Sequence, residues 1–185
     1  MNIILMGYRC TGKTVTGRYL AARLGLPYYD TDELIARQAG RTVEAIVAEQ
    51  GWPAFREAER AVIAVLSRTD RGVIALGGGA VLDAQNVENL RGNGLFVWLV
   101  ADAEIIADRM GNDPASGPQR PSLTGRPSIM EVKEILAERE PLYRRLAALA
   151  VDTTENGVEA VAEEICAGLR EKVPQAEGIF GKKEK

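Results

Sequence analysis

The residues from Gly7 to Thr14 read Gly-Tyr-Arg-Cys-Thr-Gly-Lys-Thr and match the pattern GxxxxGK[ST]. Glycines at both ends of such a loop let successive backbone N–H groups turn toward one point, where phosphate oxygens are held. The lysine adds a positive charge for the β- and γ-phosphates, and the following hydroxyl can bind Mg²⁺. The sequence therefore predicts a site for ATP and Mg²⁺. Its expected ATP contacts are Cys10, Thr11, Gly12, Lys13, Thr14 and Val15, and Thr14 is also a metal ligand.

Two aspartates, Asp30 and Asp32, follow the short apolar segment at residues 28–29. Side chains two residues apart in an extended chain point the same way, so both can face one ligand. One aspartate can hold Mg²⁺ through water opposite Thr14, and the other can accept a hydrogen bond from a hydroxyl group of the acceptor. Aspartates also cap helices, and this simpler interpretation stays open for both residues.

Glycines and arginines further along the chain are the remaining candidates. Gly77 to Gly79 follow a buried apolar segment and suggest that a ligand approaches the backbone closely, although a simple turn also uses glycines. Arg120 lies in a proline- and glycine-rich stretch, where a cation on a closing segment can meet a transferring phosphoryl group. Arg56 lies three residues before Glu59, which fits an exposed ion pair on a helix, and Arg139 lies in a charged helix end, which fits a solvated face.

The elements that must position these residues alternate between strands and helices. Strands are predicted at residues 3–6, 28–29, 73–76, 95–100 and 150–152, and helices at 12–24, 33–38, 43–50, 53–67, 83–91, 102–110, 128–146 and 158–169. In the helix at 12–24, the residues expected to face the core are Val15, Tyr19, Leu20 and Leu24. This order predicts an α/β fold around a parallel sheet. Segments 7–14, 30–32 and 77–79 all follow strands, so they should converge on one crevice.

We predict one domain over residues 1–172. Its least regular part is the stretch at 111–127, which is rich in proline and glycine and is expected to form a long functional loop, a mobile lid. Residues 173–185 are mostly polar and end in Lys-Lys-Glu-Lys, so a disordered tail is expected there.

Composition excludes several classes of function. The chain has 185 residues and a net charge of −3, which gives no basic field for nucleic acid or an anionic membrane. It contains no histidine, which excludes Ser-His-Asp hydrolases and histidine-bound metals. Cys10 and Cys166 are far apart and indicate neither a disulfide nor a zinc site. No apolar segment approaches the roughly 20 residues of a membrane span, and we expect a cytoplasmic monomer.

Six segments, in this order, resemble the shikimate kinase family from Asn2 to about Leu169. They are the loop ending in Gly12-Lys13-Thr14, Asp30-Thr31-Asp32, Phe55-Arg56-Glu57-Ala58-Glu59, Gly77-Gly78-Gly79, Arg120-Pro121 and Arg139-Glu140-Pro141-Leu142-Tyr143. Each segment after the first is a weak signal alone, but the ordered set is specific.

The resemblance implies a nucleoside-monophosphate-kinase-like fold, a three-layer P-loop kinase with a central five-stranded parallel sheet, flanking helices and a mobile lid. It implies transfer of the γ-phosphoryl group of ATP to the 3-hydroxyl group of shikimate, giving shikimate 3-phosphate and ADP in the route to chorismate and the aromatic amino acids. Mg²⁺ then falls to Thr14 and Asp30, and shikimate to Asp32, Arg56, Gly78 and Arg139. The catalytic set is Lys13, Asp32 and Arg120, and Arg120 also contacts ATP.

Two departures from the family pattern stand out. The stretch between Arg109 and Arg120 is longer than expected for the family, and residues 153–157 read Thr-Thr-Glu-Asn-Gly where an arginine near adenine is usual. Arg109 is the remaining candidate for the base. Three alternatives are a gluconate kinase, an adenylate-kinase-like enzyme and a nucleotide switch. The FRxxE and ERxPLY segments argue against a gluconate kinase. Asp32 would repel the phosphate acceptor of an adenylate-kinase-like enzyme, and a nucleotide switch leaves the arginines unexplained.

Overall fold

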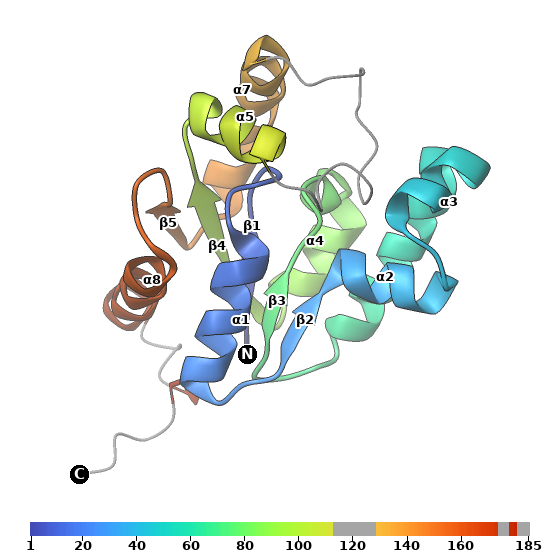
Figure 1. The fold of residues 1–185 in the computed structure, drawn as a ribbon. Helices are drawn as coiled ribbons and strands as arrows, with labels where there is room; N and C mark the ends of the chain where they lie inside the picture. The colour runs from blue at the N-terminus through green and yellow to red at the C-terminus, as the bar shows by residue number, and fades with distance from the viewer. Residues whose placement is uncertain (113–128, 174–177, 181–185) are drawn as a thin grey trace.

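The computed structural model describes residues 1–112, 129–173 and 178–180. Strands and helices alternate along this part of the chain (Figure 1). The strands are β1 (Asn2–Met6), β2 (Tyr28–Asp30), β3 (Val73–Ala75), β4 (Gly94–Val100) and β5 (Leu149–Asp152). The helices are α1 (Lys13–Leu24), α2 (Thr31–Ala39), α3 (Val43–Leu66), α4 (Ala84–Arg91), α5 (Ala103–Asn112), α7 (Ile129–Leu146) and α8 (Val158–Lys172), with a short 3₁₀ helix, η1 (Ala80–Leu82), after β3.

The five strands form one sheet in the order β2-β3-β1-β4-β5, and every pairing is parallel. The predicted fold class, a five-stranded parallel sheet flanked by helices, is therefore confirmed. Strand β1 lies in the middle, where Ile4 is in register with Ile74 of β3 and Phe96 of β4. The loop that follows β1 consequently emerges at the centre of the carboxyl edge, the usual ligand side of such a sheet.

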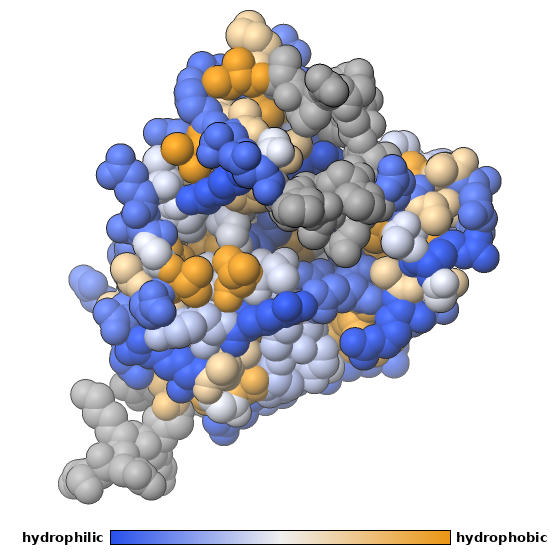
Figure 2. All heavy atoms as spheres, viewed as in Figure 1, coloured by the Kyte–Doolittle hydropathy of each residue, from blue (hydrophilic) through white to orange (hydrophobic). Residues whose placement is uncertain are grey.

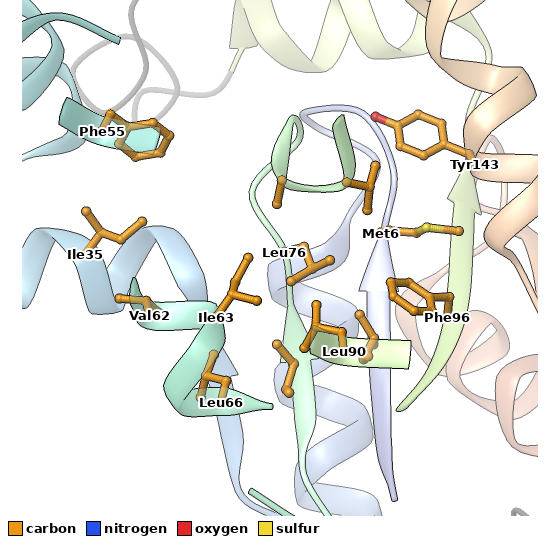
Figure 3. Packing of buried hydrophobic residues seen from close by; sticks show 14 of the residues in the cluster. Met6, Ile35, Phe55, Val62, Ile63, Leu66, Leu76, Leu90, Phe96 and Tyr143 are labelled. Carbon is orange, nitrogen blue, oxygen red and sulfur yellow. The ribbon is translucent and has the colours of Figure 1, made fainter. Parts of the chain in front are cut away.

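Alternation along the strands gives the sheet two apolar faces. Ile3 and Leu5 belong to a core built with α1 and α8, which we call the α1–α8 core. Ile4 and Met6 belong to a core built with α2, α3, α4 and α7, which we call the α3–α7 core. Figure 3 shows the α3–α7 core, with Met6 packed among residues from neighbouring strands. The molecule thus has three layers, as successive side chains of buried strands require.

Helix boundaries differ from the prediction where a cap or a glycine decides them. Helix α2 begins at Thr31, because the Asp30 carboxylate accepts hydrogen bonds from the backbone N–H groups of Asp32 and Glu33. The helices predicted at 43–50 and 53–67 form the single element α3, bent at Gly51 with φ 80° and ψ 170°. Only glycine adopts this conformation readily, so the predicted break is real although it does not separate two elements.

The prediction that Val15 faces the core is wrong, because its side chain is 55% exposed. Thr16 and Gly17 face the sheet instead. A Cβ atom on Gly17 would lie 2.6 Å from a ring carbon of Tyr28, so the small residue allows α1 to approach β2 closely. The other three predicted residues, Tyr19, Leu20 and Leu24, do pack in the α1–α8 core.

Part of the C-terminal segment is packed against the domain. Ile179 is 1% exposed within the α1–α8 core, and the Arg170 guanidinium lies 4.5 Å from the centroid of the Phe180 ring. Residues 178–180 belong to the stretch at 173–185 for which the sequence predicts a disordered tail, and in the structure they pack against α8. Residues 174–177 and 181–185, and the residues 113–128 that hold most of the predicted lid, including Arg120, lie outside the described residues.

The outer surface in Figure 2 is largely hydrophilic, with apolar side chains scattered between charged ones. Within the described residues, no helix has the length and apolar character needed to cross a membrane.

Candidate active site

The phosphate loop joins β1 to α1 at the centre of the sheet. Gly7 has φ 146°, and a Cβ atom there would lie 2.5 Å from the carbonyl oxygen of Leu99, so the chain passes too close to β4 for any side chain. Gly12 has φ 87° and caps α1, whose N-terminus points at the loop. Cys10 takes the left-handed conformation with φ 59° although it is not glycine. The loop is thus folded as an anion-binding turn at a helix N-terminus, as the motif predicts.

Lys13 lies within this loop and is 5% exposed. Its ammonium group donates hydrogen bonds to the carbonyl oxygens of Gly7, at 3.0 Å, and Tyr8, at 2.5 Å. The Thr11 hydroxyl donates to the same Tyr8 carbonyl at 2.9 Å. The positive charge is therefore held directly beside the turn, where phosphate oxygens can replace the backbone carbonyls as its partners.

The Thr14 hydroxyl and the Asp30 carboxylate lie together on the β2 side of the loop. Thr14 Oγ1 donates to Asp30 Oδ2 at 3.0 Å, and the Tyr28 hydroxyl donates to the same oxygen at 3.1 Å. Burial, together with the nearby Asp30 charge, raises the pKa of Tyr28, which keeps its hydroxyl protonated as a donor. Asp30 thus caps α2, as the simpler interpretation holds, and it also lies within hydrogen-bonding distance of Thr14, which leaves Mg²⁺ binding by this pair a prediction.

These two residues fit Mg²⁺. A hydroxyl and a carboxylate oxygen 3.0 Å apart are hard ligands. No cluster of three or more acidic, cysteine or histidine side chains that could hold a metal occurs in the described part of the chain. Mg²⁺ usually takes only one or two protein ligands and completes its shell with water and phosphate oxygens, so this sparse set is sufficient.

A pocket opens to solvent next to the phosphate loop. Its walls come from the phosphate loop, α2, α3, the glycine segment after β3, and α7. The lining residues are Tyr8, Arg9, Asp32, Val43, Trp52, Phe55, Arg56, Glu59, Gly77, Gly78, Gly79 and Arg139. The structure therefore brings together the four residues that the sequence assigns to the acceptor, Asp32, Arg56, Gly78 and Arg139.

Arg56 is fixed by charged and aromatic neighbours. Its Nη1 donates to Glu59 Oε2 at 2.6 Å, and its guanidinium lies 5.4 Å from the Trp52 ring centroid and 5.3 Å from that of Phe55. Glu59 is 0% exposed, so the pair is not the exposed ion pair that helical spacing alone suggests. Burial raises the pKa of Glu59, and the Arg56 charge opposes this shift.

On the opposite wall, two donors converge on the Gly78 carbonyl. The Tyr143 hydroxyl donates to this oxygen at 2.8 Å and Arg139 Nη1 at 3.1 Å. The Arg139 guanidinium also lies 5.7 Å from the centroid of the Tyr8 ring. Tyr143 is 0% exposed, and Figure 3 shows its hydroxyl at the edge of the α3–α7 core. The backbone at Gly78 is thereby held in one orientation.

Sequence reasoning gave no role to Trp52, Glu59 or Tyr143. Glu59 and Tyr143 end two of the quoted segments, and the aromatic pair Trp52 and Phe55 lies on the same helix, with ring centroids 5.9 Å apart. The signal for Glu59 and Tyr143 was therefore present in the segments, whereas Trp52 lies three residues before the segment that begins at Phe55. The inward orientation of these side chains depends on tertiary packing and does not follow from the sequence pattern.

Arg109 lies on the other side of the phosphate loop, at the end of α5. Its guanidinium donates to the carbonyl oxygens of Thr153, at 2.6 Å, Thr154, at 3.2 Å, and Cys10, at 3.3 Å. The Thr153 hydroxyl, 4% exposed, is 3.1 Å from the Thr11 carbonyl and 2.9 Å from the Val100 carbonyl. The loop after β5, expected near adenine, is thus fastened to the phosphate loop.

A phosphate loop at the centre of a five-stranded parallel sheet, with a cationic pocket beside it, defines a P-loop kinase of the small-molecule type. The shikimate kinase family model matches residues 9–170. The shikimate kinase of Syntrophus aciditrophicus is 48% identical over 172 residues, covering 89% of this chain and 88% of the relative. The chain therefore belongs to the shikimate kinase family.

Solved structures agree with this assignment. Shikimate kinase from Acinetobacter baumannii, in complex with shikimate, superposes with a TM-score of 0.85 at 33% identity, covering 93% of this chain and 94% of that one. A gluconokinase from Sinorhizobium meliloti superposes with a TM-score of 0.57 at 19% identity, covering 99% of this chain and 97% of that one, which is a likeness of fold alone. Gluconate kinase, the first alternative from the sequence, is thus related in architecture only.

Proposed function

We propose that this chain transfers the γ-phosphoryl group of ATP to the 3-hydroxyl group of shikimate, giving shikimate 3-phosphate and ADP in the route to chorismate. One observation carries this proposal: Arg56 and Arg139 line one pocket with Asp32, and the same pocket is bounded by the phosphate-loop residues Tyr8 and Arg9. Two guanidinium groups suit a planar carboxylate, and a carboxylate suits the hydroxyl groups of a polyol ring. Shikimate carries both kinds of group on one ring.

Within this proposal, Arg56 and Arg139 hold the carboxylate of shikimate and the Gly78 backbone contacts the ring. Asp32 accepts a hydrogen bond from a ring hydroxyl and orients the attacking oxygen. Because phosphoryl transfer is loose and largely dissociative, orientation by Asp32 matters more than its strength as a base. The apolar side chains of Val43, Trp52 and Phe55 complete the pocket and exclude water from the acceptor.

On the nucleotide side, the backbone of Cys10 to Thr14 and the Val15 position contact ATP, and Lys13 neutralises negative charge that grows on the phosphates. Thr14 and Asp30 hold Mg²⁺, which when bound neutralises charge on the β- and γ-phosphate oxygens. Arg109 is proposed to contact adenine from α5, where its guanidinium donates to the Thr153 carbonyl. Arg120 is proposed to reach the transferring phosphoryl group from the lid. We expect the enzyme to act as a monomer in the cytoplasm.

The test is a kinetic comparison of acceptors with ATP and Mg²⁺. The panel is shikimate, the same ring without its carboxylate, and gluconate. We expect turnover of shikimate, and loss of most of kcat/KM for the ring without a carboxylate. Faster turnover of gluconate would contradict the proposed substrate. Equal kcat/KM for the ring without a carboxylate would contradict the roles of Arg56 and Arg139 while leaving the activity itself intact.

Variants in the same assay separate the contributions. Arg56→Ala and Arg139→Ala should raise KM for shikimate by about 10- to 100-fold, since a hydrogen bond to a charged group contributes about 1.5–3 kcal/mol. Arg56→Lys should restore little of this, because a lysine cannot form the two-pronged contact. Arg60→Ala is the matched control, since Arg60 lies one helical turn further along α3 and pairs with Asp83 outside the pocket. It should leave KM within about twofold.

A further inference from the structure

The three consecutive glycines after β3 do not owe their presence to backbone conformation. Positive φ angles among the described glycines occur at Gly7, Gly12, Gly25, Gly40 and Gly51, and the segment from Gly77 to Gly79 is not among them. An alanine backbone can therefore adopt the conformation of all three residues. Another reason for the absence of side chains is needed.

Close contacts supply that reason at the two outer positions. A Cβ atom on Gly77 would lie 2.6 Å from Oδ1 of Asp32 and 3.1 Å from Oε1 of Glu59. A Cβ atom on Gly79 would lie 2.5 Å from Nη2 of Arg56. Carbon atoms are not tolerated at such distances, so in both cases a neighbouring atom must move.

The middle glycine behaves differently. A Cβ atom on Gly78 would meet backbone atoms only, the nearest being the amide nitrogen of Arg9 at 3.4 Å, which is an ordinary contact. Gly78 is held instead through its carbonyl oxygen by Arg139 and Tyr143. The outer glycines therefore face acceptor-binding side chains from α2 and α3, whereas the middle one contributes its backbone.

The atoms that would have to move are the ends of side chains. Asp32 and Arg56 can yield by rotation, whereas the glycine segment is anchored by the parallel ladder of β3, which directly precedes it, and by the hydrogen bond from the Gly77 N–H group to the buried hydroxyl of Thr31, at 2.8 Å. Arg56 cannot yield without disturbing its pair with Glu59 or its contacts with Trp52 and Phe55. An added methyl group should thus displace the functional group and leave the backbone in place.

We propose that Gly77 and Gly79 are positioning residues of the acceptor pocket, with Gly77 setting the place of the Asp32 carboxylate and Gly79 that of the Arg56 guanidinium. The inference rests on the proposed function, because it assigns the two glycines through the roles of Asp32 and Arg56. It makes the two outer glycines distinguishable by experiment. Gly79 acts on binding of the carboxylate, and Gly77 acts on orientation of the hydroxyl.

The test uses the full chain with Gly79→Ala and Gly77→Ala. Gly79→Ala should raise the Kd for shikimate, measured by calorimetry, and its KM, by about 10- to 100-fold, the usual effect of a small misplacement. Gly77→Ala should lower kcat by a similar factor, about 10- to 100-fold, with a smaller change in Kd. The KM for ATP should stay within about twofold in both. Gly92→Ala is the control, since Gly92 has φ −67° and nothing within 4 Å of its Cβ position.

A double-mutant cycle shows whether each glycine acts through its named partner. In an Arg56→Ala background, Gly79→Ala should change the Kd for shikimate by less than about twofold, while an undiminished effect would overturn the assignment. For Gly77→Ala the quantity compared is kcat. In an Asp32→Ala background, Gly77→Ala should change kcat by less than about twofold, while an undiminished effect would overturn the assignment. An alanine variant that does not fold would also overturn the proposal, since backbone would then have yielded. Lack of shikimate turnover by the wild-type enzyme would instead refute the proposed function.

Discussion

Lys13 illustrates how much of this site is decided by a single charge. In the structure its ammonium group is satisfied by the carbonyl oxygens of Gly7 and Tyr8, so the phosphate loop is already folded around it. The cost of ordering this loop is therefore met when the chain folds and not during the reaction. Such preorganised electrostatics usually give the largest single contribution to catalysis.

Replacing Lys13 by methionine keeps an unbranched side chain, one atom shorter, and removes its charge. We expect kcat to fall by about 10³-fold or more, because the growing charge on the phosphates loses its partner. The fold should survive, with a cost of about 1–3 kcal/mol for the hydrogen bonds that the Gly7 and Tyr8 carbonyl groups lose. Steady-state kinetics and thermal unfolding measure the two effects. Lys133→Met, at an exposed ion pair with Glu104, is the control, and a Lys13→Met enzyme with kcat within about tenfold of wild type would exclude the role.

At the scale of elements, the loop after β5 is joined to the phosphate loop by one threonine. The Thr153 hydroxyl is within hydrogen-bonding distance of the carbonyl groups of Thr11 and Val100, and Arg109 reaches both loops. Elements that are far apart in the sequence thus share one small network. A substitution in the loop after β5 should therefore alter the binding of ATP by the phosphate loop.

Thr153→Val removes the hydroxyl without changing the shape of the side chain. We expect KM for ATP to rise by about 5- to 20-fold, the equivalent of roughly 1–2 kcal/mol, because the two loops lose their fixed relation. KM for shikimate should stay unchanged, since Thr153 is not among the residues that line the acceptor pocket. Thr154→Val is the control, because the hydrogen bonds of its hydroxyl go to the exposed Asp102 N–H group and the exposed Asp152 carboxylate, whereas the Thr153 hydroxyl reaches the phosphate loop. Equal effects of the two variants on KM for ATP would contradict the link.

Across the whole molecule, the sheet separates the elements that bind the acceptor from a core that stabilises the fold. Elements on the side of the α3–α7 core, α2, α3 and α7, carry the acceptor pocket, whereas the α1–α8 core contributes no side chain to it. Ile179 closes the α1–α8 core from the C-terminal end of the chain. Stability and acceptor binding should therefore be separable by mutation.

Ile179→Ala should lower the free energy of unfolding by about 2 kcal/mol, because a buried side chain is lost. Values of kcat and KM at a temperature well below unfolding should change less than about twofold. Denaturant unfolding and steady-state kinetics measure these quantities. Val65→Ala, at a position 62% exposed, is the control and should have little effect on either. Unchanged stability of Ile179→Ala would show that residues 178–180 do not belong to the core.

The order of elements and the phosphate loop could be predicted because both depend on local patterns. Apolar runs gave the five strands, and the glycines of the loop between Gly7 and Lys13 specified a turn before a helix. Parallel strands place their carboxyl ends at one edge, so Asp32, Gly78 and the phosphate loop were expected at one crevice and lie there. The ordered segments of the family then added Arg56 and Arg139, which line the same pocket.

Tertiary packing alone decided which side chains turn inward. Helical spacing describes Arg56 and Glu59 equally well as an exposed pair, and only the position of α3 over the glycine segment buries Glu59. In the same way, Val15 fits the apolar spacing of α1 but is exposed, whereas Gly17 meets the Tyr28 ring. Burial depends on residues that are distant in the sequence and meet only after the sheet has formed. Local sequence patterns therefore determine the individual helices and strands, whereas packing between these elements determines which side chains line the pocket.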